Sequence, residues 1–154
     1  MAKPTLILFC FLLAFGTSCS GWKQDDENST QTPAEHRNLT QGDLWHLKAL
    51  EGKYPKESGF FSDTMFTQRL QKLVGPDYDF MRDTCIVESP VEVEGSIVSA
   101  SGCEAHNCGA SNFIVIADLE ANVLYAGVRK NNDVKTFSEN GKTIKQLTYF
   151  VSRF

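Results

Sequence analysis

The chain has no excess of basic residues. Its 154 residues include 15 Lys and Arg against 19 Asp and Glu, which gives a formal net charge of −4. Nucleic-acid binding needs a basic surface, so this balance argues against a nucleic-acid partner. It is compatible with a cationic protein partner, because opposite charge accelerates encounter over long range, and equally with ordinary solubility.

The chain also lacks an apolar run long enough to span a bilayer permanently. Residues 5–15 are almost all apolar, follow the basic Lys3 and precede the small residues Gly16, Thr17 and Ser18. A transmembrane helix needs about 20 apolar residues. A basic start, a short apolar run and small residues are instead typical of an export signal. We therefore expect residues 1–18 to be a signal peptide.

Cys19 directly follows these small residues and resembles the lipidated cysteine of bacterial lipoproteins, although Gly16 stands where an aliphatic residue is usual. We expect lipidation of Cys19 and a membrane-anchored lipoprotein in the cell envelope. Cleavage near Ser18 or Ser20, which would give a periplasmic protein, and an uncleaved anchor are the alternatives. Residues 19–41 are polar and aperiodic and predict a flexible tether. Residues 42–154 have the length of one small domain.

Cysteine is scarce, with five residues in all. Cys10 leaves with the signal and Cys19 lies in the tether, so the domain keeps Cys85, Cys103 and Cys108. An oxidising compartment favours a disulfide, and Cys103 and Cys108 are the natural pair. Closing so short a loop constrains the unfolded chain by roughly 2 kcal/mol. Cys85 is then odd, and we interpret it as a small buried hydrophobe.

The domain begins with helical patterns. Asp43 can cap a short helix that ends at Gly52, and Ser62 can cap a longer one. The longer helix carries apolar residues at helical spacing and stops at Gly75. One more helical turn is expected over residues 79–83, and a closing helix over residues 143–154.

The pattern changes to strands after Cys85. Strands are expected over residues 91–94, 97–100, 113–117, 122–128 and 134–137, with a turn at residues 131–133. Helices followed by a meander of hairpins indicate an α+β fold, an antiparallel sheet of about five strands with flanking helices.

The most concentrated chemistry lies in residues 103–108, Cys-Glu-Ala-His-Asn-Cys, which we call the cysteine loop. It can be a purely structural hairpin tip. It can be a metal site of Cys103, His106 and Cys108, although a fourth ligand is not evident. It can be a thiol nucleophile with His106 as base, which a disulfide would abolish. It can also be a rigid recognition loop with His106 as its anchor.

Residues 96–109, followed by the apolar strand 113–117 and by residues 123–128, resemble the inhibitor of vertebrate lysozyme family. That family carries Cys-x-x-His-x-Cys on a loop between two strands of an antiparallel sheet with packed helices. The resemblance extends over about residues 61–128. It implies that the loop plugs the active-site cleft of a c-type lysozyme, with His106 hydrogen-bonded to the catalytic carboxyl groups and Cys103 and Cys108 holding the loop.

The chain departs from the best-studied form of this loop. Glu104 and Ala105 stand in place of a basic residue and a proline, and Asn107 replaces an acidic residue. Loss of the proline predicts a less rigid loop, and Glu104 would bring negative charge toward catalytic carboxylates. These three residues with His106 form the predicted partner-binding set.

The leading hypothesis is thus an exported inhibitor of lysozyme or a related glycan-cleaving enzyme, with no catalytic residue, cofactor or resident metal. The alternative is a non-inhibitory envelope binding module of the same fold, with an unknown ligand or metal.

Overall fold

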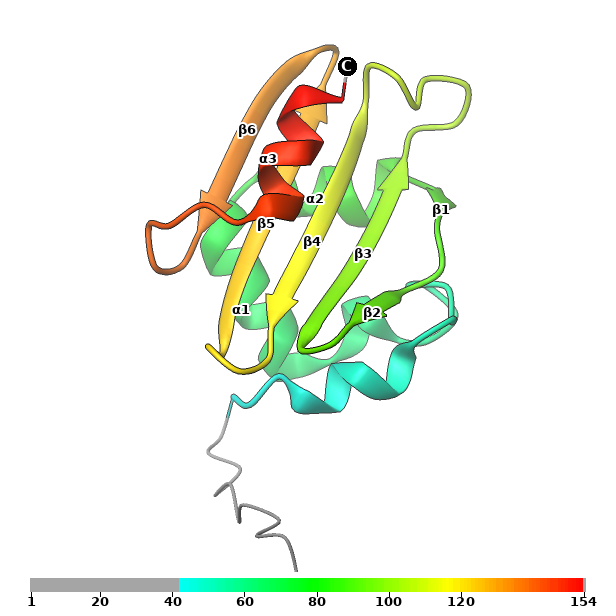
Figure 1. Ribbon diagram of the computed structural model, residues 1–154. Coiled ribbons are helices and arrows are strands. Elements are labelled where there is room, and N and C mark those ends of the chain that lie inside the picture. The colour runs from blue at the N-terminus through cyan, green and yellow to red at the C-terminus, as the bar shows by residue number, and fades with distance from the viewer. Residues whose placement is uncertain (1–41, 154) are drawn as a thin grey trace, which may run out of the picture. The chain divides into compact units, whose positions relative to one another are not determined.

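A computed structural model describes residues 42–153, which form one six-stranded antiparallel sheet with helices on both faces (Figure 1). The main strand order is β1-β3-β4-β5-β6, and β2 pairs with the other half of the β3 edge that β1 occupies. The strands are β1 (Val87–Glu88), β2 (Glu92–Glu94), β3 (Ile97–Cys103), β4 (Asn112–Asp118), β5 (Val123–Lys130) and β6 (Asp133–Ser138).

Helices α1 and α2 lie behind the sheet in Figure 1, and α3 lies in front of it. The helical segments are η1 (Trp45–Leu50), η2 (Phe60–Ser62), α1 (Thr64–Val74), α2 (Asp77–Asp79), η3 (Phe80–Thr84) and α3 (Lys145–Ser152). None of the helices within residues 42–153 is long and apolar enough to cross a membrane.

Helix α1 forms because its sequence supplies a cap, an apolar stripe and a stop. The Asp63 carboxylate accepts a hydrogen bond from the Phe66 amide at 2.8 Å, which satisfies an otherwise orphaned donor. Phe66, Leu70 and Val74 recur every four residues and are buried. Gly75 ends the helix at a φ of 58°. The predicted cap Ser62 was wrong by one residue, because Ser62 is the last residue of η2.

The sheet separates two apolar clusters. Along β3 buried and half-buried residues alternate, so Val98 and Ala100 face the main core under α1 while Ser99 and Ser101 face the other side. On that second face, Ile116 and Tyr125 are buried against Leu147 of α3. The alternation along β3 therefore decides which of its residues face the same side of the sheet as α3.

Close packing of α3 depends on a glycine in β5. A Cβ atom placed on Gly127 would lie 2.5 Å from the Phe150 ring, far inside van der Waals contact. Arg129 of β5 donates to the Phe150 carbonyl at 3.4 Å, near the end of α3. These contacts hold α3 over β5, at a distance from β1 and β2.

A buried carboxylate ties α2 to the far edge of the sheet. Asp77 is 4% exposed and contacts the Lys130 ammonium at 2.6 Å and the Lys135 ammonium at 3.2 Å. Burial alone would raise the pKa of Asp77, but the hydrogen bonds and charges of the two lysines outweigh it and lower that pKa. Asp77 therefore stays ionised and bridges the two strands.

The predicted α+β class and antiparallel sheet are confirmed, as are the five predicted strands, each within a few residues of its observed bounds. The sequence missed β1, which has only two residues. The segment expected as a short helix from Asp43 is a 3-10 helix, with the Asp43 carboxylate accepting from the Trp45 amide. The turn expected at residues 79–83 is split between α2 and the π-type turn η3. The closing helix is confirmed as α3.

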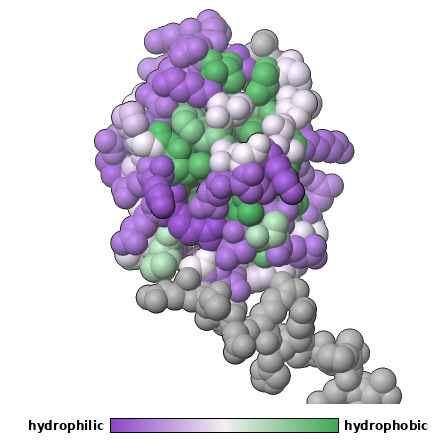
Figure 2. All heavy atoms as spheres, turned by 90° about the vertical axis from the view of Figure 1, so that its left-hand side faces the viewer, coloured by the Kyte–Doolittle hydropathy of each residue, from purple (hydrophilic) through white to green (hydrophobic). Residues whose placement is uncertain are grey.

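Figure 2 views the molecule from the side of strand β6 and shows mostly hydrophilic side chains with scattered hydrophobic spots. Asp133, Lys135 and Thr136 of this strand are exposed. Charged side chains on an edge strand discourage pairing with another chain. The predicted signal peptide, Cys19 and the tether lie outside the described residues.

Candidate functional site

The cysteine loop joins β3 to β4 at one end of the sheet. Cys103 is the last residue of β3, and it forms a disulfide with Cys108 across a Cα–Cα distance of 4.8 Å. The predicted disulfide is therefore present. It closes the loop on the strand end, so the loop begins from a fixed base.

Asn107 organises the interior of the loop. Its amide nitrogen Nδ2 donates to the Glu104 carboxylate at 2.6 Å and to the Ser111 hydroxyl at 3.1 Å. Its backbone N–H donates to the Glu104 carbonyl at 3.0 Å, and its own carbonyl accepts from the amides of Ala110 and Ser111. Glu104 and Asn107 were predicted to contact a partner protein. In the structure they bind each other, and this pairing stiffens the loop, which lacks a proline.

His106, between these two residues, is exposed. Its φ of 63° places it in the left-handed region, which is uncommon for a residue with a Cβ atom. The neighbouring Ala105 is half-buried. The loop therefore turns inward with Glu104 and Asn107 and presents the imidazole outward.

The loop rests on the turn between β5 and β6. Asn131 and Asn132 both have positive φ, and their backbone amides donate to the Ser111 hydroxyl at 3.2 Å and the Ala110 carbonyl at 2.9 Å. Asn112 adds a hydrogen bond from its Nδ2 to the Cys108 carbonyl. Sequence reasoning found the Asn131 turn but not its role. The predicted meander could have suggested this contact, because it places the β3–β4 and β5–β6 connections at the same end of the sheet.

Two alternative readings of the loop do not fit this geometry. The disulfide uses both sulfur atoms, which removes the metal set of Cys103, His106 and Cys108 and the thiol nucleophile together. No group of three His, Cys, Asp or Glu side chains within residues 42–153 is placed to hold a metal.

Cys85 is the free cysteine of the described region and is fully buried, as its interpretation as a core residue predicted. Burial, with a smaller contribution from the nearby Glu104 charge, raises the pKa of the Cys85 thiol to about 12. The thiol is therefore protonated at neutral pH and is not a nucleophile.

The family model of the inhibitor of vertebrate lysozyme (Ivy) matches residues 65–149, from α1 into α3. The match extends beyond residue 128, where the resemblance read from the sequence had ended, and so includes β6 and most of α3. No curated protein and no solved structure matches the chain. The match covers 85 of the 154 residues and contains the whole cysteine loop. The chain therefore belongs to the inhibitor of vertebrate lysozyme family, whose members are lysozyme inhibitors and not enzymes.

Proposed function

We propose that this protein inhibits a c-type lysozyme, or a related glycan-cleaving enzyme, by inserting the cysteine loop into the catalytic cleft. The observation that carries the proposal is the exposed His106 on a loop that a disulfide and the Asn107 network hold in one shape. A loop that is already ordered loses little conformational entropy when it binds.

The chemistry of the target suits an imidazole. A glycosidase of this type works with two carboxyl groups in different protonation states. A neutral imidazole donates from one ring nitrogen and accepts at the other, so His106 can pair with both groups at once. A ring that enters the cleft also occupies the place of the scissile bond, which accounts for inhibition without any catalytic step.

Glu104 is the residue that this proposal must accommodate. Its carboxylate is half-buried and bound to Asn107, so it lies at the base of the loop and not at the tip. Its negative charge nevertheless stands two residues from His106, where it would repel ionised carboxylates of the target. We infer that Glu104 stabilises the loop at a cost in electrostatic attraction.

Replacing Glu104 with Gln separates these two effects. A glutamine oxygen can still accept from Asn107, while the charge is removed. The measurement is a titration of residues 20–154 into a c-type lysozyme assay. We expect Glu104→Gln to bind the enzyme about 1–2 kcal/mol more tightly than the parent, a five- to thirtyfold gain in affinity. Glu120→Gln is the matched control, because Glu120 is exposed in the β4–β5 turn at the other end of the sheet.

Two outcomes would count against this account. Weaker binding by Glu104→Gln would mean that Glu104 meets a basic rim of the enzyme and not its acidic cleft. Complete lack of inhibition by the parent protein would favour the non-inhibitory binding module instead.

We also propose that the protein is exported and anchored through lipid on Cys19. The basic start, the short apolar run and the small residues before Cys19 support this localisation. So does the Cys103–Cys108 disulfide, since such bonds persist in oxidising compartments. A lipid anchor would hold the inhibitor in the envelope, where an invading lysozyme acts.

Cys19→Ala should move the protein from the membrane fraction to the soluble envelope fraction, because lipid attachment requires the thiol. Fractionation followed by immunoblotting measures this, with Cys10→Ala as the control that keeps membrane partition. Membrane association of Cys19→Ala equal to that of the parent would point to an uncleaved apolar anchor.

A further inference from the structure

The cysteine loop alone is too small for a stable complex with an enzyme. Of its six residues, His106 and Cys108 are exposed and the others are half-buried. A stable protein–protein interface buries about 800 Å² of each partner and involves roughly 20–30 residues on each side. Surface next to the loop must therefore also contact the enzyme.

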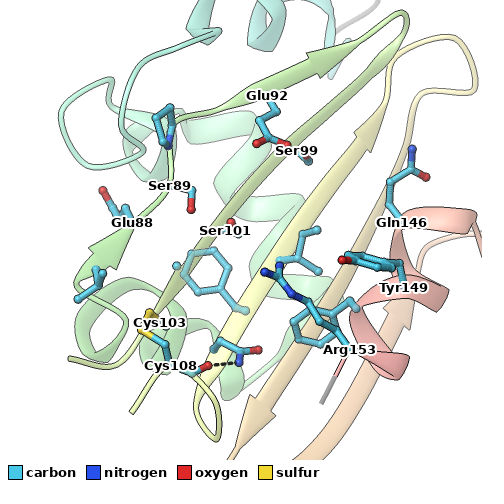
Figure 3. A pocket seen from close by; sticks show the side chains of 17 residues that line it. Glu88, Ser89, Glu92, Ser99, Ser101, Cys103, Cys108, Gln146, Tyr149 and Arg153 are labelled. Atoms are coloured by element: carbon cyan, nitrogen blue, oxygen red, sulfur yellow. Dashed lines mark hydrogen bonds between the residues drawn. A yellow bond between two sulfur atoms is a disulfide. The ribbon is translucent and has the colours of Figure 1, made fainter. Parts of the chain in front are cut away.

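Ile86 and Val87 lie beside the base of the loop. Val87 is the first residue of β1 and pairs with Cys103, the last residue of β3, so it lies next to the strand end from which the loop begins. Val87 also lines the same hollow as Cys103 and Cys108, on the face of the sheet that carries α3. Figure 3 looks into this hollow and shows Glu88, the residue after Val87, along one edge, with the disulfide at one end.

Both side chains expose apolar surface that the domain does not cover. Ile86 is 57% exposed and Val87 is 47% exposed. Single exposed apolar residues are ordinary on protein surfaces. Within residues 42–153, however, this is the one place where two consecutive large hydrophobic residues are both exposed. Their position beside a recognition loop indicates that a partner covers them.

The other flank of the loop is polar. There the loop rests on the β5–β6 turn, where Asn131 and Asn132 are exposed. Burial of apolar surface is favourable in proportion to its area, whereas a polar side chain must replace its bonds to water. The Ile86–Val87 side is therefore the flank that can add more to the affinity.

The charge along this edge of the sheet favours a cationic partner over a second copy of the chain. Residues 83–94 contain four acidic residues and no basic one. Arg82 and Lys56 offset Asp83. Glu92 and Glu94 of β2 are exposed, on the same edge of β3 that β1 occupies. A second copy paired along this edge would bring like charges together, whereas a cationic enzyme is attracted to it.

We propose that Ile86 and Val87 form a second contact with the inhibited enzyme, an apolar patch that packs on the rim of its cleft beside the cysteine loop. This inference rests on the proposed function, because it names a further part of the same interface. His106 supplies hydrogen bonds inside the cleft, and the apolar pair adds surface that loses its water only in the complex. Such a short-range contact slows dissociation and leaves association nearly unchanged.

The test compares the parent with the double variant Ile86→Thr/Val87→Thr, through the rates at which a c-type lysozyme binds to and leaves the mature chain. Threonine keeps the β-branched shape and the preference for strands, but it replaces apolar surface with a hydroxyl group. We expect the dissociation rate to rise about tenfold and the association rate to change by less than about twofold.

Met65→Thr is the matched control. Met65 is 36% exposed on α1, one turn before Arg69, which bonds to Asn122 in the β4–β5 turn at the other end of the sheet. Loss of this apolar side chain should leave both rates at the parent values. The single variant Ile86→Thr lies outside the strands, and it should raise the dissociation rate by about threefold even if the double variant does not fold.

Thermal unfolding shows which variants are folded. A folded Ile86→Thr/Val87→Thr protein that dissociates at the parent rate would overturn this contact and leave the loop-plug function standing. No binding of lysozyme by the parent would overturn both, because no enzyme would then cover the pair. Sedimentation of the free protein adds a third outcome. A parent dimer that the double variant converts to a monomer would assign the pair to self-association and would also overturn the proposal.

Discussion

His106→Ala should weaken inhibition of a c-type lysozyme by roughly ten- to a hundredfold while the domain stays folded. His106 carries the exposed imidazole of the cysteine loop, and no core residue depends on it. A hydrogen bond to a charged group contributes about 1.5–3 kcal/mol, which corresponds to that range of affinity. The measurement is the inhibition constant of the parent and the variant, with thermal unfolding as the check on the fold.

The backbone at His106 requires a matched pair of variants. Its φ of 63° is unfavourable for alanine, whereas glycine adopts it freely and asparagine tolerates it. Comparing His106→Gly with His106→Asn tests the side chain, because each keeps the left-handed turn at low strain. If the imidazole is the anchor, all three variants should lose most of the inhibition. A His106→Asn protein as potent as the parent would refute the loop-plug mechanism, even within this family.

The cysteine loop could be predicted because it lies within one short stretch of sequence, where the spacing of the two cysteines decides their pairing. Two cysteines five positions apart indicate a short disulfide loop with His106 inside, and that disulfide is present. The continuous apolar run over residues 113–117 likewise indicates a buried central strand. These features depend on residues that are neighbours in the chain.

The supports of the loop could not be predicted in the same way. Asn131 and Asn132 reach the loop only because the β5–β6 turn and the β3–β4 connection meet at one end of the sheet. The pairing of Glu104 with Asn107 depends on the left-handed turn at His106, which composition does not reveal. The Glu104 carboxylate and the Asn107 amide were predicted to contact a partner protein, yet in the fold they bond to each other within the loop.

Strand β1 and the position of α3 on the sheet could not be predicted for different reasons. Two residues are too few to show alternation, so Val87 and Glu88 gave no strand signal. The sequence indicated the closing helix but not which strands α3 covers. That in turn depends on Gly127 meeting Phe150, a contact between distant parts of the chain.

Arg69 of α1 has a structural role that its place in the sequence does not reveal. It precedes the buried Leu70 in the helix. In the fold its guanidinium donates to both oxygens of Glu139, at 3.1 and 2.6 Å, and to the Gly42 carbonyl at 2.7 Å. It also donates to the side chain and carbonyl of Asn122, each at 2.8 Å. Glu139 in turn accepts from the Leu124 amide at 2.7 Å.

These bonds join α1 to the turn before β5, to the residue after β6 and to the start of the domain. The side chains of Arg69 and Glu139 are 22% and 25% exposed, so water replaces the lost bonds only in part. We expect Arg69→Ala to lower the free energy of unfolding by about 2–4 kcal/mol, because it removes both guanidinium bonds to Glu139 and the donor to the Gly42 and Asn122 carbonyls. Arg69→Lys should recover only part of this, since an ammonium cannot reproduce the bidentate fork.

Urea denaturation measures both variants, and Arg82→Ala is the matched control. Arg82 also bonds two carboxylates, those of Asp79 and Asp83, but on an exposed surface where solvent screens the pairs. We expect Arg82→Ala to leave the urea midpoint nearly unchanged and Arg69→Ala to lower it by about 1–2 M. Equal midpoints for the two alanine variants would mean that the Arg69 contacts contribute no more than surface ion pairs.

The cysteine loop at the opposite end of the sheet should keep its shape in Arg69→Ala below the unfolding transition. Inhibition by the folded variant should therefore match the parent, which separates what holds the domain together from what binds the enzyme.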